Sequence, residues 1–421
     1  MAVALVMGNM IGSGIFLLPA SLAPYGGLSL IGWLVSAGGA LLLATVFARL
    51  SRIDPAAGGP YAYTRRAFGD LPGFLVAWGY WIAIWTALAA LAVAFIGYLS
   101  PFFPQLVERP IVAAAASIGA VWALVIVNII GVRTAGWVQV ATTGLKLLPL
   151  IGVSLFGLLH FDSSHFFVAQ RETRSLMSAV PAVVTLTLWA FTGLESATVP
   201  AGSIRDPDRT IPRATMVGTI LAAAIYILST VGVMSLLAPA QLGTSAAPFA
   251  DAARTLGGNW AASAVAAGAA ISCFGALNGW TLLAGQLPLA VARDGLFPSL
   301  FAKVSARETP VAGLIIAGAL TTALVSVNYT RTLVDLFTFF ILLSTLNTLI
   351  PYVFSSLAVF LLRDGPRHPP LSTGGKGAAA LAFIYALWAM GGAGQEAVYW
   401  GFLLLMTGLP VYVFIVSRRR S

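Results

Sequence analysis

Residues 8–19 read Gly-Asn-Met-Ile-Gly-Ser-Gly-Ile-Phe-Leu-Leu-Pro and place a Gly-Ser-Gly triplet inside an otherwise apolar run. Glycine is less favourable than alanine in a helix interior by about 1 kcal/mol, so the triplet invites a break in a helix. If the run crosses a bilayer, unwound backbone is tolerated only where it lines a cavity or is buried in protein. The stretch therefore predicts an interrupted membrane helix beside a cavity or against other helices.

The composition of the whole chain supports a membrane location. Of 421 residues, 59% are hydrophobic and 9% are charged, whereas a soluble domain carries about 25% charged residues. So few charges cannot cover a water-exposed surface, and lipid must be the solvent for much of the protein. A net charge of +9 would suggest nucleic acid in a soluble protein, but here we expect the lipid bilayer, and no nucleic acid, as the partner. The single cysteine, Cys273, excludes an internal disulfide and lies in an apolar run.

Twelve apolar runs alternate with short polar clusters, on the scale of the ~20 residues that a helix needs to cross a bilayer. Their approximate bounds are 1–23, 28–50, 74–100, 111–131, 136–159, 177–203, 214–238, 259–290, 310–328, 332–361, 378–392 and 397–416. We therefore predict an all-α integral membrane fold of twelve transmembrane helices, in a single transmembrane domain over residues 1–421. The first run lacks a basic leader and a cleavage site, so we expect a retained helix rather than a signal peptide.

The loops between these runs predict the orientation. If alternate loops face the same side of the membrane, seventeen Lys and Arg residues fall on the side of the C-terminus and five on the other, with Lys146 inside a span. Short loops rich in Lys and Arg stay in the cytoplasm. The sequence therefore predicts a multi-pass protein with both termini in the cytoplasm.

A second stretch that invites a break lies in the sixth run. Residues 188–196 read Leu-Trp-Ala-Phe-Thr-Gly-Leu-Glu-Ser, so that Gly193 and the ionisable Glu195 lie at mid-membrane depth. A broken helix exposes N–H groups that suit a carboxylate and C=O groups that suit an ammonium, the two charged groups of an α-amino acid. The alternative is that the small residues only allow close helix packing. Breaks in the first and sixth spans, however, fit an inverted repeat with a site between its halves.

Four separated motifs resemble the amino acid–polyamine–organocation transporters. Residues 8–19 are similar to the first helix of that family and residues 188–197 to the sixth. Gly-Trp-Thr-Leu-Leu-Ala-Gly-Gln at 279–286, followed by Asp-Gly-Leu-Phe-Pro at 294–298, resembles the eighth helix and the loop after it. Residues 55–69, which contain Gly-Gly-Pro-Tyr-Ala-Tyr, also match. Within the family, the chain is most similar to the basic amino acid/polyamine antiporters, particularly the bacterial arginine/agmatine antiporter.

The resemblance implies a five-plus-five inverted repeat of the LeuT type, with helices 1 and 6 interrupted. The repeats would cover roughly residues 1–160 and 177–361, followed by two extra helices at 378–416. It also implies alternating access, a location in the bacterial cytoplasmic (inner) membrane, and it suggests a homodimer.

The resemblance further implies a substrate site between the two breaks and the third, eighth and tenth spans. Its residues would be Met10, Ile11, Ser13, Gly14, Ile84, Leu88, Trp189, Thr192, Trp280 and Ser344. The region of Ser13 and Gly14 would receive the substrate carboxylate. Backbone carbonyls near Met10, Trp189 and Thr192 would take the α-ammonium. Trp189 would lie over the substrate, and Trp280 would line the route.

Two of these positions depart from the arginine/agmatine antiporter. Ile84 and Leu88 stand where that protein has a cysteine and an asparagine that faces the guanidinium. A guanidinium without hydrogen-bond partners would bear a large desolvation cost. The departure therefore favours a neutral or apolar substrate side chain over arginine.

Four residues are candidates for gating and proton linkage. The resemblance assigns this role to Asn9, Tyr80 and Glu195. Lys146 is a departure, because it lies inside the fifth span, about ten residues from the nearer end, which makes snorkelling to the interface difficult. A lysine at mid-membrane costs about 2.5–3.5 kcal/mol on insertion scales and needs a partner. Our hypothesis is that Lys146 reaches the first break near Gly12 as a tethered cation or a proton carrier.

The function predicted from these observations is secondary-active transport of α-amino acids by alternating access, through exchange or proton linkage. One alternative is an antiporter of the arginine/agmatine or ornithine/putrescine type, for basic amino acids and their amines. An alternative of another class is a membrane channel. Motifs of an enzyme or a P-loop are not found, and the three histidines lack metal-ligand spacing. We therefore expect no enzyme activity, no cofactor and no metal, with an amino acid as the small-molecule substrate.

Overall fold

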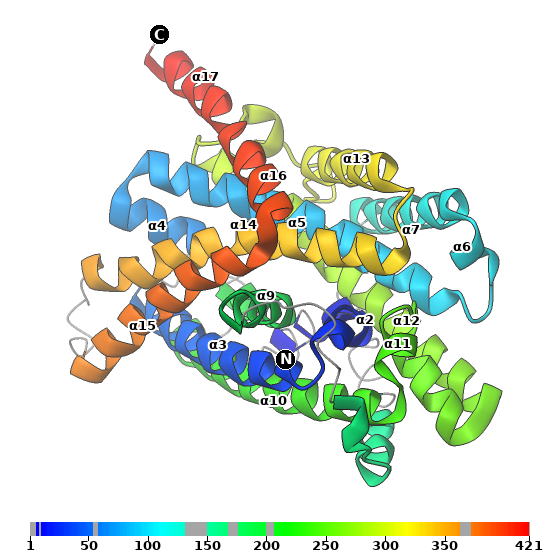
Figure 1. Cartoon of the computed structure of the whole chain (residues 1–421). Coiled ribbons are helices and arrows are strands. Elements are labelled where there is room, and N and C mark those ends of the chain that lie inside the picture. The colour runs from blue at the N-terminus through cyan, green and yellow to red at the C-terminus, as the bar shows by residue number, and fades with distance from the viewer. Residues whose placement is uncertain are drawn as a thin grey trace.

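The computed structural model describes residues 6–7, 10–53, 58–130, 150–166, 176–198, 206–362 and 372–420. Within these ranges the chain forms helices joined by turns, and no strand is present (Figure 1). The elements are α2 (Ser13–Leu22), η1 (Ala23–Tyr25), α3 (Leu28–Ile53), α4 (Pro60–Phe68), α5 (Asp70–Leu99), α6 (Gln105–Glu108), α7 (Pro110–Ile130), η2 (Ser163–Phe166), α9 (Leu176–Trp189), η3 (Ser196–Thr198), α10 (Pro207–Leu236), α11 (Pro239–Leu242), α12 (Pro248–Arg293), η5 (Ser299–Ala302), α13 (Val311–Asn328), α14 (Leu333–Leu361), α15 (Thr373–Met390), η6 (Gly391–Ala393), α16 (Gly394–Met406) and α17 (Gly408–Arg420). The predicted all-helical class is confirmed.

Eight helical segments in the described ranges are long and apolar enough to cross a membrane. They are Leu28–Ile53, Asp70–Leu99, Pro110–Ile130, Arg209–Leu236, Pro248–Arg293, Val311–Asn328, Leu333–Leu361 and Thr373–Arg418. Shorter apolar helices lie at Gly14–Tyr25, Leu150–Leu159 and Ala179–Trp189, in the predicted first, fifth and sixth runs. The total of twelve spans stays a prediction.

Helix α5 forms the centre of the molecule. It is apolar around its whole circumference, and a helix of that kind is buried on all sides. It packs most extensively against α14 and α12, while α3 packs against α10. Polar side chains attach α5 to its neighbours: the Trp81 indole donates to the Ala284 carbonyl (3.2 Å), and Ser344 Oγ donates to the Ala83 carbonyl (2.7 Å). This packing gives the two broken spans a fixed surface to lie against.

A charged cluster attaches α4 to the end of α12. The Tyr61 hydroxyl donates to Asp294 Oδ2 (2.9 Å). The Arg65 guanidinium forms ion pairs with Asp70 (2.8 Å) and Asp294 (3.0 Å). Burial, helped by the hydrogen bond to Asp294, raises the pKa of the Tyr61 hydroxyl well above its usual value. The tyrosine therefore stays a neutral donor, and α4 is held against the end of α12.

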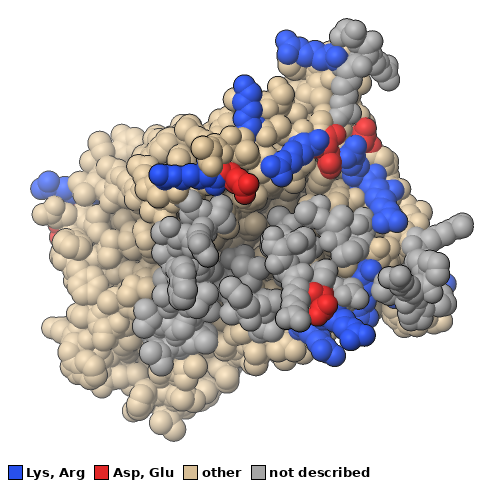
Figure 2. All heavy atoms as spheres, turned by 180° about the vertical axis from the view of Figure 1, so that it is seen from behind, with Lys and Arg blue, Asp and Glu red and all other residues tan. Residues whose placement is uncertain are grey.

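The two ends of the molecule differ in charge. Figure 1 shows α4 at one end and α6 and α11 at the opposite end. On the face in Figure 2, Lys and Arg side chains gather toward the right of the view, and uncharged residues cover most of the left. Because Figure 2 is turned by 180° from Figure 1, the basic end is the one that carries α4.

Candidate functional site

The first span is broken just before α2. Ile11 and Gly12 form a bend, and the helix begins at Ser13. Gly12 precedes the helix with non-helical angles (φ −134°, ψ −140°), and no side chain caps the helix start. The Gly12 N–H donates to the Met10 carbonyl (3.0 Å). Met10, Ile11 and Gly12 are all buried, so the break lies against other parts of the protein.

The sixth span is broken after Trp189. Helix α9 ends there, residues 190–195 form turns, and η3 follows. Gly193 has φ +98°, in the left-handed region that a residue with a Cβ adopts only at a cost. The glycine in the motif therefore serves the turn itself, beyond any role in close helix packing.

The carbonyls of this break can be counted one by one. Those of residues 187, 188, 191 and 193 accept backbone N–H groups of the same turn. The Trp189 carbonyl accepts both the N–H (3.1 Å) and the Oγ1 hydroxyl (2.7 Å) of Thr192, and the Ala190 carbonyl accepts the Tyr226 hydroxyl (2.9 Å). Among the carbonyls of residues 187–193, only that of Thr192 accepts no hydrogen bond from the described part of the chain. Of the two carbonyls in this span predicted for an ammonium, Thr192 is therefore available, whereas Trp189 is already used twice.

The two breaks touch. A Cβ added to Gly14 would lie 3.0 Å from Ala190 Cα and 3.2 Å from Trp189 Cδ1. A Cβ added to Gly12 would lie 2.8 Å from Ala276 Cβ on α12. Gly14 therefore allows a close approach to the backbone of the sixth span, and Gly12 a close approach to the Ala276 side chain.

The predicted aromatic pair also lies at this contact. The rings of Trp189 and Trp280 are stacked, with centroids 6.4 Å apart and an interplanar angle of 21°. Trp280 lies one helical turn after Ala276 on α12, the residue that faces the first break. Both indoles are almost fully buried, at 4% and 2% exposure. They are thus not surface anchors of the kind that tryptophan often provides.

A buried carboxyl lies next to the break of the sixth span. Glu195 accepts hydrogen bonds from the Tyr80 hydroxyl on α5 (2.5 Å), from the Tyr352 hydroxyl on α14 (2.5 Å) and from the Gly193 N–H (3.2 Å). All three side chains are buried. The predicted pair of Tyr80 and Glu195 is thus brought together, and Tyr352 is a partner that the sequence does not reveal. Its one signal is that it lies two turns after Ser344 in an apolar run.

The remaining predicted residues differ in how the structure uses them. Ile84 and Leu88 are fully buried on α5. The Ser344 hydroxyl bonds the Ala83 carbonyl, so it joins two helices in this conformation. Asn9 and Lys146 lie outside the described residues, and the side chain of Ser13 is likewise not described.

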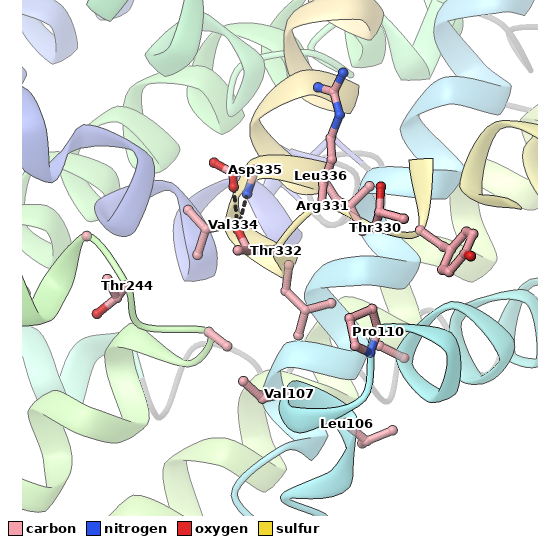
Figure 3. A pocket seen from close by; sticks show the side chains of 15 residues that line it. Leu106, Val107, Pro110, Thr244, Thr330, Arg331, Thr332, Val334, Asp335 and Leu336 are labelled. Carbon is pink, nitrogen blue, oxygen red and sulfur yellow. Dashed lines mark hydrogen bonds between the residues drawn. The ribbon is translucent and has the colours of Figure 1, made fainter. Parts of the chain in front are cut away.

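A cavity of about 390 Å³ lies at the end of the molecule that carries α6, and Figure 3 shows its lining. Its walls come from α6 and α7, the turn at 243–246, and residues 329–336 at the start of α14. The guanidinium of Arg331 pairs with Glu396 (2.5 Å), and Asp335 bonds Thr332, so both charged residues of the lining serve structural contacts. No residue of the predicted substrate site lines this cavity.

Comparison with known proteins agrees with the motifs. A family model described as an amino acid permease matches residues 1–416. The cadaverine/lysine antiporter of Escherichia coli (strain K12) is 40% identical over 327 residues, which cover 76% of this chain and 72% of that protein. The putrescine transporter PotE of Haemophilus influenzae is 31% identical over 415 residues (98% and 95%), and that of Escherichia coli (strain K12) is 29% identical over 418 residues (98% and 94%). All three are named as transporters or antiporters rather than enzymes. The chain belongs to the amino acid permease family of membrane transporters.

Proposed function

We propose that the protein exchanges α-amino acids across a membrane by alternating access, and that the substrate binds between the two broken spans. The observation that supports this most directly is the contact between an uncapped helix start at Ser13 and a break whose Thr192 carbonyl has no partner in the described structure. The helix start offers N–H donors, and the break of the sixth span offers a carbonyl acceptor. An α-amino acid has a carboxylate for the donors and an ammonium for the acceptor.

The start of α2 suits a carboxylate. The first four N–H groups of a helix have no partner within the helix, and the helix dipole adds partial positive charge there. In α2 no side chain caps this end, and its first turn contains no acidic residue. The neighbouring residues Gly12, Gly14 and Ile15 are buried, so a carboxylate would bind away from bulk water.

The break of the sixth span suits an ammonium. An ammonium brings three donors and needs acceptors when it leaves water. The Thr192 carbonyl, which accepts no hydrogen bond from the described residues, supplies one. The Thr192 hydroxyl, now bonded to the Trp189 carbonyl, could turn to accept a second donor and release Trp189 as a third acceptor.

Burial of the site residues supports an occluded conformation. Trp189, Thr192 and Trp280 are each less than 5% exposed. Substrate entry therefore requires movement. We assign the gate that closes the site toward the α4 end to Glu195 and its partners Tyr80 and Tyr352. A proton on the Glu195 carboxyl would turn one oxygen from acceptor to donor, so one tyrosine hydrogen bond would reverse or break. That change would link gate opening to protons.

The finer architecture belongs to the same proposal. Twelve spans with cytoplasmic termini, a five-plus-five inverted repeat over 1–160 and 177–361, and residence in a bacterial inner membrane are supported by the family and by the basic end of the molecule. The homodimer is proposed from family resemblance alone.

A second candidate function is exchange of a basic amino acid for its decarboxylated amine. The similarity to the cadaverine/lysine antiporter supports it. The apolar side chains of Ile84 and Leu88 favour a substrate with a neutral side chain. They could also pack along the methylene chain of lysine or cadaverine. A lysine substrate would still need an acceptor for its terminal ammonium.

Counterflow in proteoliposomes tests both functions. Vesicles with purified protein are preloaded with one unlabelled compound and given labelled lysine, arginine, leucine or cadaverine. A carrier accelerates uptake when its substrate is inside, whereas a channel does not. Exchange of lysine for cadaverine would favour the second candidate, and exchange among neutral amino acids the first. Uptake that is insensitive to every preload would refute the proposal.

A further inference from the structure

Tyr226 makes a hydrogen bond that the substrate site does not itself require. Its hydroxyl donates to the Ala190 carbonyl (2.9 Å), in the first turn of the break after α9. Tyr226 is fully buried on α10. Its ring packs against Trp33 of α3 (centroids 5.3 Å) and against Phe191 of the break (5.3 Å). The break is thus attached to the α3–α10 pair by one hydrogen bond and an aromatic cluster.

Ala190 is also the residue that lies closest to Gly14, beside the break of the first span. The backbone at Gly14 comes so close that an added Cβ would lie 3.0 Å from Ala190 Cα. Tyr226 therefore holds the Ala190 carbonyl, and the second residue of α2 lies close to Ala190 Cα. The two breaks thus meet at the Ala190 peptide, two residues before Thr192, whose carbonyl accepts no hydrogen bond from the described residues.

We propose that Tyr226 is a positioning residue that fixes the distance between the carboxylate-binding and ammonium-binding halves of the site. This role rests on the proposed function. Without the hydroxyl, the Ala190 peptide can turn, and its carbonyl gains the freedom to compete with Thr192 for the ammonium. The spacing between donors and acceptors then varies.

The consequence depends on the ligand. An amino acid must reach both halves at once, so it needs the fixed spacing. An amine without a carboxylate needs only the carbonyls of the break. Loss of the Tyr226 hydroxyl therefore weakens binding of the amino acid and does not weaken binding of the amine, because a freed Ala190 carbonyl removes no acceptor and can add one.

The test is the Tyr226→Phe protein, which keeps the ring and its packing. Binding of lysine and cadaverine, and of leucine and isoamylamine, is measured by calorimetry on the full chain in detergent. For the amino acid that the wild type binds, we expect the Kd to rise roughly two- to tenfold, the range of one net hydrogen bond. The Kd of its amine should not rise, so the ratio of the two changes.

Tyr98→Phe is the matched control. Tyr98 is also fully buried, and its hydroxyl donates to the Phe16 carbonyl (2.6 Å), further along α2. The Tyr98 hydroxyl also accepts the Phe249 N–H (3.3 Å), so Tyr98→Phe loses a bond of the same kind and one more. It should therefore lower stability at least as much as Tyr226→Phe does, without changing the ratio. An unchanged ratio in Tyr226→Phe, or an equal change in Tyr98→Phe, would overturn the positioning role alone. A wild type that binds no amino acid would overturn the proposed function and this role with it.

Discussion

Gly14 lies where the backbones of the two breaks leave little room for a side chain. An added methyl would lie 3.0 Å from Ala190 Cα and 3.2 Å from Trp189 Cδ1, closer than most real Cβ contacts. Because the first neighbour is backbone, it cannot rotate away. We expect Gly14→Ala to push the breaks apart and to reduce exchange at least about tenfold, which corresponds to ~1.4 kcal/mol or more.

The measurement is counterflow at matched protein density, with folding checked by gel filtration. Gly119→Ala on α7 is the control, since a Cβ there meets no atom within 4 Å in the described structure. Alanine is also the better helix former. Normal exchange by Gly14→Ala would show that the substrate does not bind at this contact.

Glu195→Gln tests the proposed link between protons and the gate. An amide presents one oxygen and one donor group, as a protonated carboxyl does. Glu195→Gln should therefore hold the Tyr80 and Tyr352 contacts permanently in the protonated arrangement and remove the pH dependence of exchange. Rates are compared from mildly acidic to mildly alkaline pH. The exposed Glu108→Gln should keep the wild-type profile. A wild-type profile in Glu195→Gln would eliminate the proton-linked gate.

These residues also show what the sequence could predict of the site. Glycines 12, 14 and 193 were predictable because the bilayer gives broken backbone so few permitted surroundings. Tyr226 and Tyr352 were not, because tyrosine in an apolar run is typical of an interface anchor. Their bonds reach Ala190 and Glu195 across 36 and 157 positions, and no local pattern contains that information.

At the scale of elements, α4 depends on its attachment to α12. It has only nine residues, and isolated helices of that length are marginal in water. Asp294 receives both the Tyr61 hydroxyl and the Arg65 guanidinium, so Asp294→Ala should destabilise the protein by roughly 1–3 kcal/mol and lower its thermal midpoint.

A double-mutant cycle checks that prediction. Tyr61→Phe removes the same hydrogen bond as Asp294→Ala. The double variant should therefore lose less stability than the sum of the two single losses. Glu108→Ala, at an exposed carboxylate on α6, should be close to neutral. Fully additive losses would mean that the Tyr61–Asp294 bond contributes nothing to stability.

The helices themselves follow the hydrophobic runs closely where lipid sets their length. The predicted runs 111–131, 310–328 and 332–361 match α7, α13 and α14 within two residues at each end. Helix α12 is longer than its predicted run, 259–290, because a kink at Gly257 and Gly258 joins a preceding helix to the span. Hydrophobicity could not predict α4, because its nine residues are too few to cross a bilayer and include Arg65 and Arg66.

For the molecule as a whole, the basic end and the helix directions together predict its orientation. By the sequence, seventeen of the Lys and Arg residues fall between or beyond the predicted runs on the side assigned to the cytoplasm. Figure 1 shows the C-terminal helix α17 reaching toward the end that carries α4, and Figure 2 shows basic side chains gathered there. The loop that contains η2 is assigned to the opposite side. It is held by the Phe166 carbonyl, which accepts the Gly27 N–H (2.9 Å).

The single cysteine makes this orientation testable. Cys273 is fully buried, so Cys273→Ala gives a background without reactive thiols. Ser164→Cys in η2 and Ser417→Cys in α17 each replace an exposed serine. With a membrane-impermeant thiol reagent on intact cells, Ser164→Cys should be labelled and Ser417→Cys should react only after permeabilisation. Both must be labelled in detergent, which confirms that each thiol is accessible. The reverse pattern would mean that the orientation is inverted. Labelling of both in intact cells would mean that both positions lie outside the membrane. An even number of spans would then separate them, and the predicted odd number of spans after residue 164 would be wrong.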